Sequence, residues 1–288
     1  MTTLSADRGR AYILTGPGLA LFAGLLGVPL IMTMLLSFYG FDFTKGIEPG
    51  FTLANYLEVL SDSYFHKIFL RTFVIALVVT LICILLGAPE AYILSRMRNP
   101  WKSLFLIVIL GPLLISVIVR TLGWALLIGG KGMISEALLA LRITDAPVSL
   151  MFTTSGMVIA LVHVLVPFMV LAVWASIQRI DPQVEDAALT LGAGKLTVLR
   201  RIVLPQIMPG VLSGSLIVFA LTASAFATPS IIGGRRLKVV ATTAYDEYLN
   251  TLNWPLGAAI ALLLLAANVA IIMSYNRVIE RRFAKVFE

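Results

Sequence analysis

Long apolar stretches separated by short charged segments dominate the sequence. Six of these stretches have the roughly 20 mainly apolar residues that a membrane-crossing helix needs. They cover residues 12–38, 68–94, 104–128, 156–177, 211–232 and 256–275. Glycine and proline interrupt several of them, which membrane helices tolerate because neighbouring helices satisfy the freed backbone groups. The alternation typical of barrel strands is absent, so the pattern predicts an all-α membrane protein with six transmembrane helices.

Composition supports lipid as the solvent. The chain is 59% hydrophobic and 13% charged, with a mean hydropathy of +0.96, whereas soluble domains carry about 25% charged residues. We therefore expect residues 1–288 to form a single transmembrane domain. The first apolar run is too long for a signal-peptide core and lacks a convincing cleavage site, so it is expected to stay as the first span.

Basic residues predict the orientation. Most of the 22 lysines and arginines gather on what would be one side of the membrane, and this side is expected to be cytoplasmic together with both termini. They are Arg8, Arg10, Arg96, Arg98, Lys102, Arg179, Lys195, Arg200, Arg201, Arg277, Arg281, Arg282 and Lys285. A group at 235–238 after the fifth stretch breaks the pattern. The net charge is +7, but the basic residues flank the apolar spans and do not form a basic groove. Nucleic-acid binding is therefore not expected.

Residue patterns that carry catalysis are missing. Cys83 is the only cysteine, and His66 and His163 have no partner at metal-ligand spacing, so no metal site and no catalytic residue is predicted. The segment 192–195, Gly-Ala-Gly-Lys, resembles a phosphate loop. However, Leu196 stands where a magnesium-binding hydroxyl is needed and Leu189 where the first glycine belongs, which excludes a nucleotide site.

The segment 178–210, between the fourth and fifth stretches, has helix signals. Asp181 and Pro182 predict a helix start, and Gly192 predicts its end. Val184, Ala187, Ala188 and Leu191 fall on one face of that helix. A second short helix is predicted from Lys195 to Leu204, closed by Pro205. Periodicity alone leaves open whether the first helix lies on its own bundle or receives another protein.

The spacing within this segment resembles a known family signature. Asp186-Ala187-Ala188, three residues, Gly192, nine residues, Ile202, one residue and Leu204-Pro205 match the Glu-Ala-Ala-x3-Gly-x9-Ile-x-Leu-Pro signature. That signature belongs to permease subunits of binding-protein-dependent ABC importers. Asp186 replaces the usual glutamate, which puts in doubt a salt bridge made by that carboxylate.

Further short motifs resemble the spermidine/putrescine-type branch of these permeases, although related importers of amino-acid-like or phosphonate solutes share much of the pattern. The motifs are Met151-Phe152-Thr153 with Val166-Pro167-Phe168-Met169, Arg120-Thr121 with Trp124, Pro229 with Gly233-Gly234, and Asn253-Trp254-Pro255 with Gly257-Ala258-Ala259.

The resemblance implies a bacterial inner-membrane subunit with a type I importer-like fold. The segment 178–210 would contain the coupling helix. The implied partners are a second permease subunit, most simply a different chain, an ATPase dimer that holds the ATP and magnesium, and an extracytoplasmic solute-binding protein. This chain itself would need no cofactor and would catalyse no reaction. The family's mechanism implies alternating access driven by ATP.

Polar residues inside the spans are the candidates for the solute path. In the third stretch these are Arg120 and Trp124, although reaching the outer interface or bracing a neighbouring helix is the preferred explanation for Arg120. A second group precedes Pro229 in the fifth stretch: Thr222, Ser224, Phe226 and Thr228. Packing between helices through small residues explains most of this pattern and is preferred over a solute path. His163 is expected to make a packing hydrogen bond, and Glu90 to pair with a residue such as Arg96.

An acidic and aromatic group in the last external loop is the candidate entrance, with an interfacial aromatic belt as the alternative. It consists of Tyr245, Asp246, Glu247, Tyr248 and Trp254. Together with the family resemblance, this group favours a small cationic or zwitterionic solute, with polyamines first. An ion-coupled secondary transporter is the alternative from another class, although the internal repeats typical of such proteins are not evident.

Overall fold

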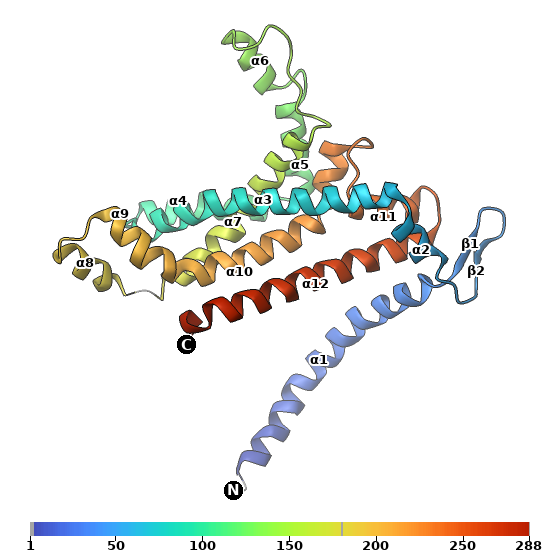
Figure 1. Ribbon diagram of the computed structural model, residues 1–288, viewed down its shortest axis with the longest axis horizontal. Helices are drawn as coiled ribbons and strands as arrows, with labels where there is room; N and C mark the ends of the chain where they lie inside the picture. Colours follow the sequence, from blue (N-terminus) through green and yellow to red (C-terminus); the bar gives the residue numbers. More distant parts are fainter. Residues whose placement is uncertain (1–2, 180, 288) are drawn as a thin grey trace. The chain divides into compact units, whose positions relative to one another are not determined.

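The computed structural model describes residues 3–179 and 181–287, and the side chains of residues 15–179, 181 and 183–277. Most of the chain is helical (Figure 1). The α-helices are α1 (Thr3–Leu36), α2 (Ala54–Ser61), α3 (Ser63–Arg96), α4 (Trp101–Leu114), α5 (Val117–Ile128), α6 (Met133–Ala140), α7 (Thr154–Ile177), α8 (Pro182–Thr190), α9 (Lys195–Val198), α10 (Leu204–Ala223), α11 (Val240–Leu249) and α12 (Trp254–Phe287). Two π-helical segments, η1 (Leu199–Val203) and η2 (Pro229–Gly233), flank α10. A short antiparallel hairpin pairs β1 (Gly40–Asp42) with β2 (Gly46–Glu48).

Among the described residues, six helical runs are long and apolar enough to cross a membrane. They are Thr15–Leu36, Ser63–Arg96, Val117–Ala140, Thr154–Ile177, Lys195–Ala223 and Trp254–Arg277. The predicted all-α fold with six spans is therefore confirmed. The side chains of Arg8, Arg10, Arg281, Arg282 and Lys285, on which part of the predicted orientation rests, lie outside the described side chains.

The third and fifth predicted stretches are organised differently from the expectation. The stretch 104–128 breaks at residues 115–116, where Ile115 takes an extended conformation three residues after Pro112. Pro205 does not close a second short helix, so that prediction is wrong. Instead, α9, η1 and α10 follow one another from Lys195 to Ala223, with Pro205 in the first turn of α10. The wider π-helical turn before Pro205 accommodates the residue that cannot donate.

The chain divides into two compact units. The first consists of Met1–Ser63 with Thr243–Leu263. In it, the Asn55 amide donates to the carbonyls of Ser37 and Tyr39, both at 2.9 Å, and thereby ties α2 to the end of α1. The hydroxyls of Ser37 and Tyr56 lie 2.7 Å apart and reinforce the same junction.

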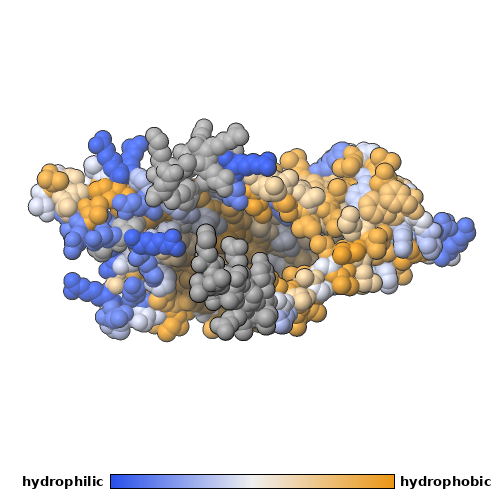
Figure 2. Space-filling model, turned by 90° about the horizontal axis from the view of Figure 1, so that it is seen from below, coloured by the Kyte–Doolittle hydropathy of each residue, from blue (hydrophilic) through white to orange (hydrophobic). Residues whose placement is uncertain are grey.

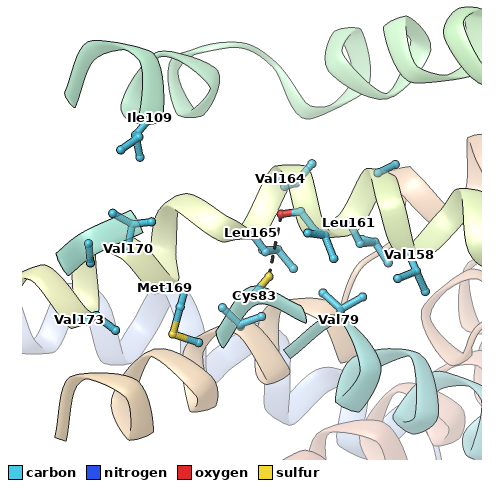
Figure 3. Packing of buried hydrophobic residues seen from close by; sticks show 14 of the residues in the cluster. Val79, Cys83, Ile109, Val158, Leu161, Val164, Leu165, Met169, Val170 and Val173 are labelled. Carbon is cyan, nitrogen blue, oxygen red and sulfur yellow. Dashed lines mark hydrogen bonds between the residues drawn. The ribbon is translucent and has the colours of Figure 1, made fainter. Parts of the chain in front are cut away.

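The second unit consists of Tyr64–Thr242 with Leu264–Glu288, and α7 lies at the centre of its core. Figure 3 shows apolar side chains of α7 interleaved with those of α3, and the Cys83 thiol directed at the carbonyl of Val162, 4.0 Å away. Against the other side of α7, a Cβ added to Gly210 of α10 would lie 2.7 Å from the Ala172 carbonyl oxygen. A larger residue would clash at this point, so the glycine allows α10 and α7 to approach closely here.

Apolar side chains also cover much of the surface. On the face shown in Figure 2, hydrophobic residues cover much of the area that is not grey, and hydrophilic residues gather on the left, on the side of α8 and α9, with a smaller group at the far right. Leu25, Leu26 and Leu85 are about 70% exposed. Side chains of this kind are stable outside the core when lipid is the solvent.

Candidate functional site

The helix α8 has well-defined ends that the sequence encodes. The Asp181 side chain accepts a hydrogen bond from the Gln183 amide at 3.0 Å, as an N-cap does. At the other end, Gly192 has φ +85°. Its N–H donates to the Leu189 carbonyl and that of Ala193 donates to the Ala188 carbonyl, both at 3.0 Å. These two bonds form a Schellman motif, so α8 is a short and separately capped helix.

An ion pair anchors α8 to the bundle. Glu185 is only 7% exposed and bonds to the guanidinium of Arg96, at the end of α3. The Tyr92 hydroxyl donates to the other oxygen of the same carboxylate at 3.4 Å. Arg96 also lies over the Tyr92 ring, 5.3 Å from its centroid. Three side chains from α3 and α8 therefore fix one face of α8.

The predicted partner of Glu90 is thus wrong, because Arg96 binds Glu185 instead. Sequence reasoning missed Glu185, although one signal was present: Glu185 precedes Ala188 by three residues and so shares its side of the helix. Ala188 is partly buried against the core. Side chains on this side therefore face the bundle.

The predicted apolar face of α8 points largely away from the bundle. Val184 is 43% and Leu191 88% exposed, and Ala187 is also exposed. Asp186 is exposed as well, and among the described residues its carboxylate forms no ion pair. Of the remaining signature residues, Ile202 packs against the core, whereas Leu204 and Pro205 are exposed.

A small cavity of about 260 Å³ lies beside this anchor. The ammonium group of Lys102 lies over the Trp174 ring on its wall, 5.5 Å from the ring centroid. Arg96 and Glu185 line the same space. The end of the bundle next to α8 is thus polar and mainly basic.

A second, larger cavity lies among α3, α4, α5 and α7, with a volume of about 530 Å³. Its walls are mostly apolar, and Glu90, Trp124 and His163 contribute the polar groups. The Trp124 indole donates to Nδ1 of His163 at 3.1 Å, so the expected hydrogen bond of His163 is present. This cavity brings one predicted path residue, Trp124, together with Glu90 and His163, for which structural roles were predicted.

Arg120 braces the end of α4. One of its guanidinium nitrogens donates to the Pro112 carbonyl at 2.6 Å, in the last turn of α4. A cation is favourable at this position because helix carbonyls lack partners there. Arg120 is not among the residues that line the larger cavity, so this geometry matches the bracing role that the sequence left open.

The predicted path residues near Pro229 differ in their burial and in their hydrogen-bond partners. Thr228 is buried, and its hydroxyl lies 3.1 Å from that of Thr121 in α5. Thr222 is buried and donates to the Val218 carbonyl at 2.7 Å. Ser224 is exposed and bonds to its own helix, and Phe226 is half-buried. Two of the three hydroxyls, those of Thr222 and Thr228, thus serve packing within the second unit.

The predicted entrance residues belong to the first unit. Tyr248 stacks on Trp254 with ring centroids 6.4 Å apart, and Tyr245 and Trp254 are each 45% exposed. Asp246 and Glu247 accept hydrogen bonds from Asn250 and Thr251. Burial raises the pKa of the nearby Glu58 carboxyl, and the charges of Glu247 and Asp62 raise it further. Acidic groups therefore concentrate beside exposed aromatic rings.

Within the described residues, no group of three histidine, cysteine or acidic side chains is placed to hold a metal ion. The features above define a class of protein: a helical membrane subunit with a separately capped helix, α8, between its fourth and fifth spans.

Comparison with known proteins narrows this class. A family model described as "Binding-protein-dependent transport system inner membrane component" matches residues 107–285, and the chain belongs to this family. The spermidine/putrescine transport system permease protein PotB of Escherichia coli K12 is 33% identical over 250 residues, covering 87% of this chain and 90% of that protein. The inner membrane ABC transporter permease protein YdcU of the same organism is 32% identical over 270 residues, covering 85% of each. The predicted resemblance is confirmed.

The fold is also found among solved structures. A chain of the bacterial alginate ABC transporter, crystallised with its alginate pentasaccharide-bound periplasmic protein, matches with a TM-score of 0.75 at 17% sequence identity. The match covers 97% of this chain and 98% of that one. The membrane fold of such permeases is therefore preserved along nearly the whole chain.

Proposed function

We propose that this chain is one of two permease subunits of an ATP-driven importer and that α8 is its coupling helix. The observation that carries the proposal is the orientation of α8. One face is anchored through Glu185 and Arg96, while Val184, Ala187 and Leu191 are exposed on the other. A rigid helix with an exposed apolar face fits the groove of a partner protein.

The partners follow from this assignment. An ATPase dimer receives α8 from each permease subunit and holds all the ATP and magnesium, and an extracytoplasmic protein delivers the solute. The second permease is a different chain. The basic end that carries α8 and α9 faces the cytoplasm, as do both termini. Closure of the ATPase pair moves the bundle because α8 makes different contacts in the two states.

The solute is a small cationic or zwitterionic amine, and polyamines are the first choice. The similarity to a spermidine/putrescine permease supports this choice, as do Asp246 and Glu247 beside exposed aromatic rings. Acidic and aromatic side chains together favour an ammonium group. Amino-acid-like solutes and phosphonates are the alternatives within the same family.

The test of the substrate is competition for labelled spermidine uptake by cells that carry the complete importer. Putrescine and unlabelled spermidine are expected to compete, and 4-aminobutyrate to compete weakly. Cells without this chain serve as the control. No uptake of labelled spermidine, together with uptake of a labelled phosphonate that requires this chain, would contradict a cationic solute and would make Arg120 the leading contact for an anion.

A further inference from the structure

The ionisable side chain of Glu90 lies within the second span. Glu90 belongs to α3 and lines the cavity of about 530 Å³. Among the residues that the structure describes, none forms a hydrogen bond or an ion pair with its carboxylate. Arg96, the basic residue nearest along the helix, is bound to Glu185. A carboxylate at membrane depth is costly and usually faces a bundle interior or a functional cavity.

The walls of this cavity suit an alkyl chain. Between Ile82 and Glu90, which both line it, α3 rises about 12 Å at 1.5 Å per residue. Val108 of α4 and Val158 of α7 contribute further apolar surface. The volume lies in the range of small-molecule sites, which are mostly apolar with a few convergent polar groups. An extended aliphatic ligand therefore fits the shape and the chemistry.

The second polar region of the cavity is formed by Trp124 and His163. Their rings lie 5.4 Å apart at 66°, and Nδ1 of His163 accepts the indole hydrogen. An imidazole that accepts at Nδ1 is neutral and carries its proton on Nε2. The nearby Arg120 is held by the Pro112 carbonyl. Glu90 thus contributes the formal charge among the lining residues, and that charge is negative.

We propose that this cavity is a solute site of the transport path and that it takes a linear alkylammonium ion. One ammonium group binds the Glu90 carboxylate, the methylene chain lies along the apolar walls, and a second amine lies against the Trp124 ring. This inference rests on the proposed function, because it names the residues by which the permease would recognise a polyamine. A lipid tail would fill the same walls but would leave the carboxylate without a partner.

The test compares Glu90→Gln with Glu90→Asp in the complete importer, reconstituted in proteoliposomes with its ATPase and binding protein. Glu136→Gln, which removes a carboxylate from exposed α6, is the matched control. We expect Glu90→Gln to lower spermidine uptake on the order of tenfold to a hundredfold, the effect of losing a charge-assisted hydrogen bond. Glu90→Asp should retain part of the uptake, and Glu136→Gln nearly all of it.

Three results would overturn the inference, and they are distinguishable. Unchanged uptake by Glu90→Gln excludes the cavity site and leaves the proposed function intact. Loss of the second permease from purified Glu90→Gln complexes would mean that Glu90 pairs with a cation of that subunit. Absence of spermidine and putrescine uptake by the unaltered importer would overturn the proposed substrate and this site together.

A second pair of variants keeps the inference testable if Glu90→Gln fails to insert. Trp124→Phe keeps an aromatic face and Trp124→Leu removes it, while both lose the bond to His163. Uptake should fall further in Trp124→Leu, by at least several-fold relative to Trp124→Phe. Equal uptake by the two variants would exclude contact between the ring and the solute.

Discussion

Single charges determine how α8 is held. Glu185 and Asp186 are adjacent in the sequence, yet only Glu185 is buried and paired. Successive residues on a helix point in directions about 100° apart, so one carboxylate reaches α3 while the other faces outward. The signature position is occupied by Asp186, and the inward contact belongs to its neighbour. The doubt about the shorter side chain of Asp186 therefore does not affect the anchor of α8.

For the ion pair of Arg96 and Glu185 we predict that removing the two partners has unequal effects on stability. Arg96→Met leaves a buried carboxylate without its cation and should cost about 2 kcal/mol. Glu185→Gln leaves an arginine whose side chain is 41% exposed, which water can solvate, and should cost clearly less. Thermal unfolding of the purified complex in detergent would show whether Arg96→Met lowers the unfolding temperature more than Glu185→Gln does.

Charge reversal provides the control for this prediction. Arg96→Glu and Glu185→Arg should each impair ATP-driven transport, and the double variant should recover a substantial part of it. If the double variant is no better than either single variant, the ion pair does not hold α8.

At this scale the sequence predicted side-chain chemistry better than side-chain partners. The cap at Asp181 and the stop at Gly192 depend on residues within one turn, and both are found. The partner of Arg96 lies 89 positions away in the sequence and depends on how α3 and α8 meet, which local spacing does not specify. The same is true of the cavity around Glu90, whose walls come from four helices.

At the scale of elements, α8 combines rigidity with an exposed apolar face. Both of its ends are closed by local hydrogen bonds, and its inner face is tied to α3. A helix of nine residues would be unstable in isolation. Its anchor and its caps therefore allow it to present Ala187 and Leu191 outward without unfolding.

This arrangement predicts where the ATPase binds. Ala187→Arg places a long charged side chain on the exposed face and should abolish or strongly reduce co-purification of the ATPase. Thr197→Arg, on the exposed side of α9, is the matched control and should retain the ATPase. Normal recovery of the ATPase with Ala187→Arg would show that this face of α8 is not the docking surface.

Hydropathy predicted the number of spans but not where the helices break. A membrane helix needs a stretch of apolar residues, and that requirement is visible in the sequence. The effect of a proline depends on which other groups satisfy the backbone around it. Helix α4 ends two residues after Pro112, and Arg120 donates to the Pro112 carbonyl. Before Pro205 the π-helical turn η1 accommodates the missing N–H group, and the chain continues as α10. The same residue type therefore gave two outcomes that the local sequence did not distinguish.

At the scale of the whole molecule, the described residues include six apolar helical runs long enough to cross a membrane, and the junction of α3 with α8 carries the basic side chains of Arg96 and Lys102. Within the described residues the chain holds no cluster suited to a metal. The segment 192–195 serves as the end of α8 and the start of α9, where Gly192 is needed for its positive φ. In the proposed function the energy for transport comes from the ATPase, and α8 transmits it to the bundle.

The most direct test is uptake of labelled spermidine by proteoliposomes that contain this chain with its second permease, ATPase and binding protein. The account predicts uptake when ATP reaches the ATPase side, and none when a proton or sodium gradient is imposed without ATP. Liposomes that lack the ATPase should stay inactive under both conditions. Uptake driven by an ion gradient in the absence of the ATPase would contradict the account and identify a secondary transporter.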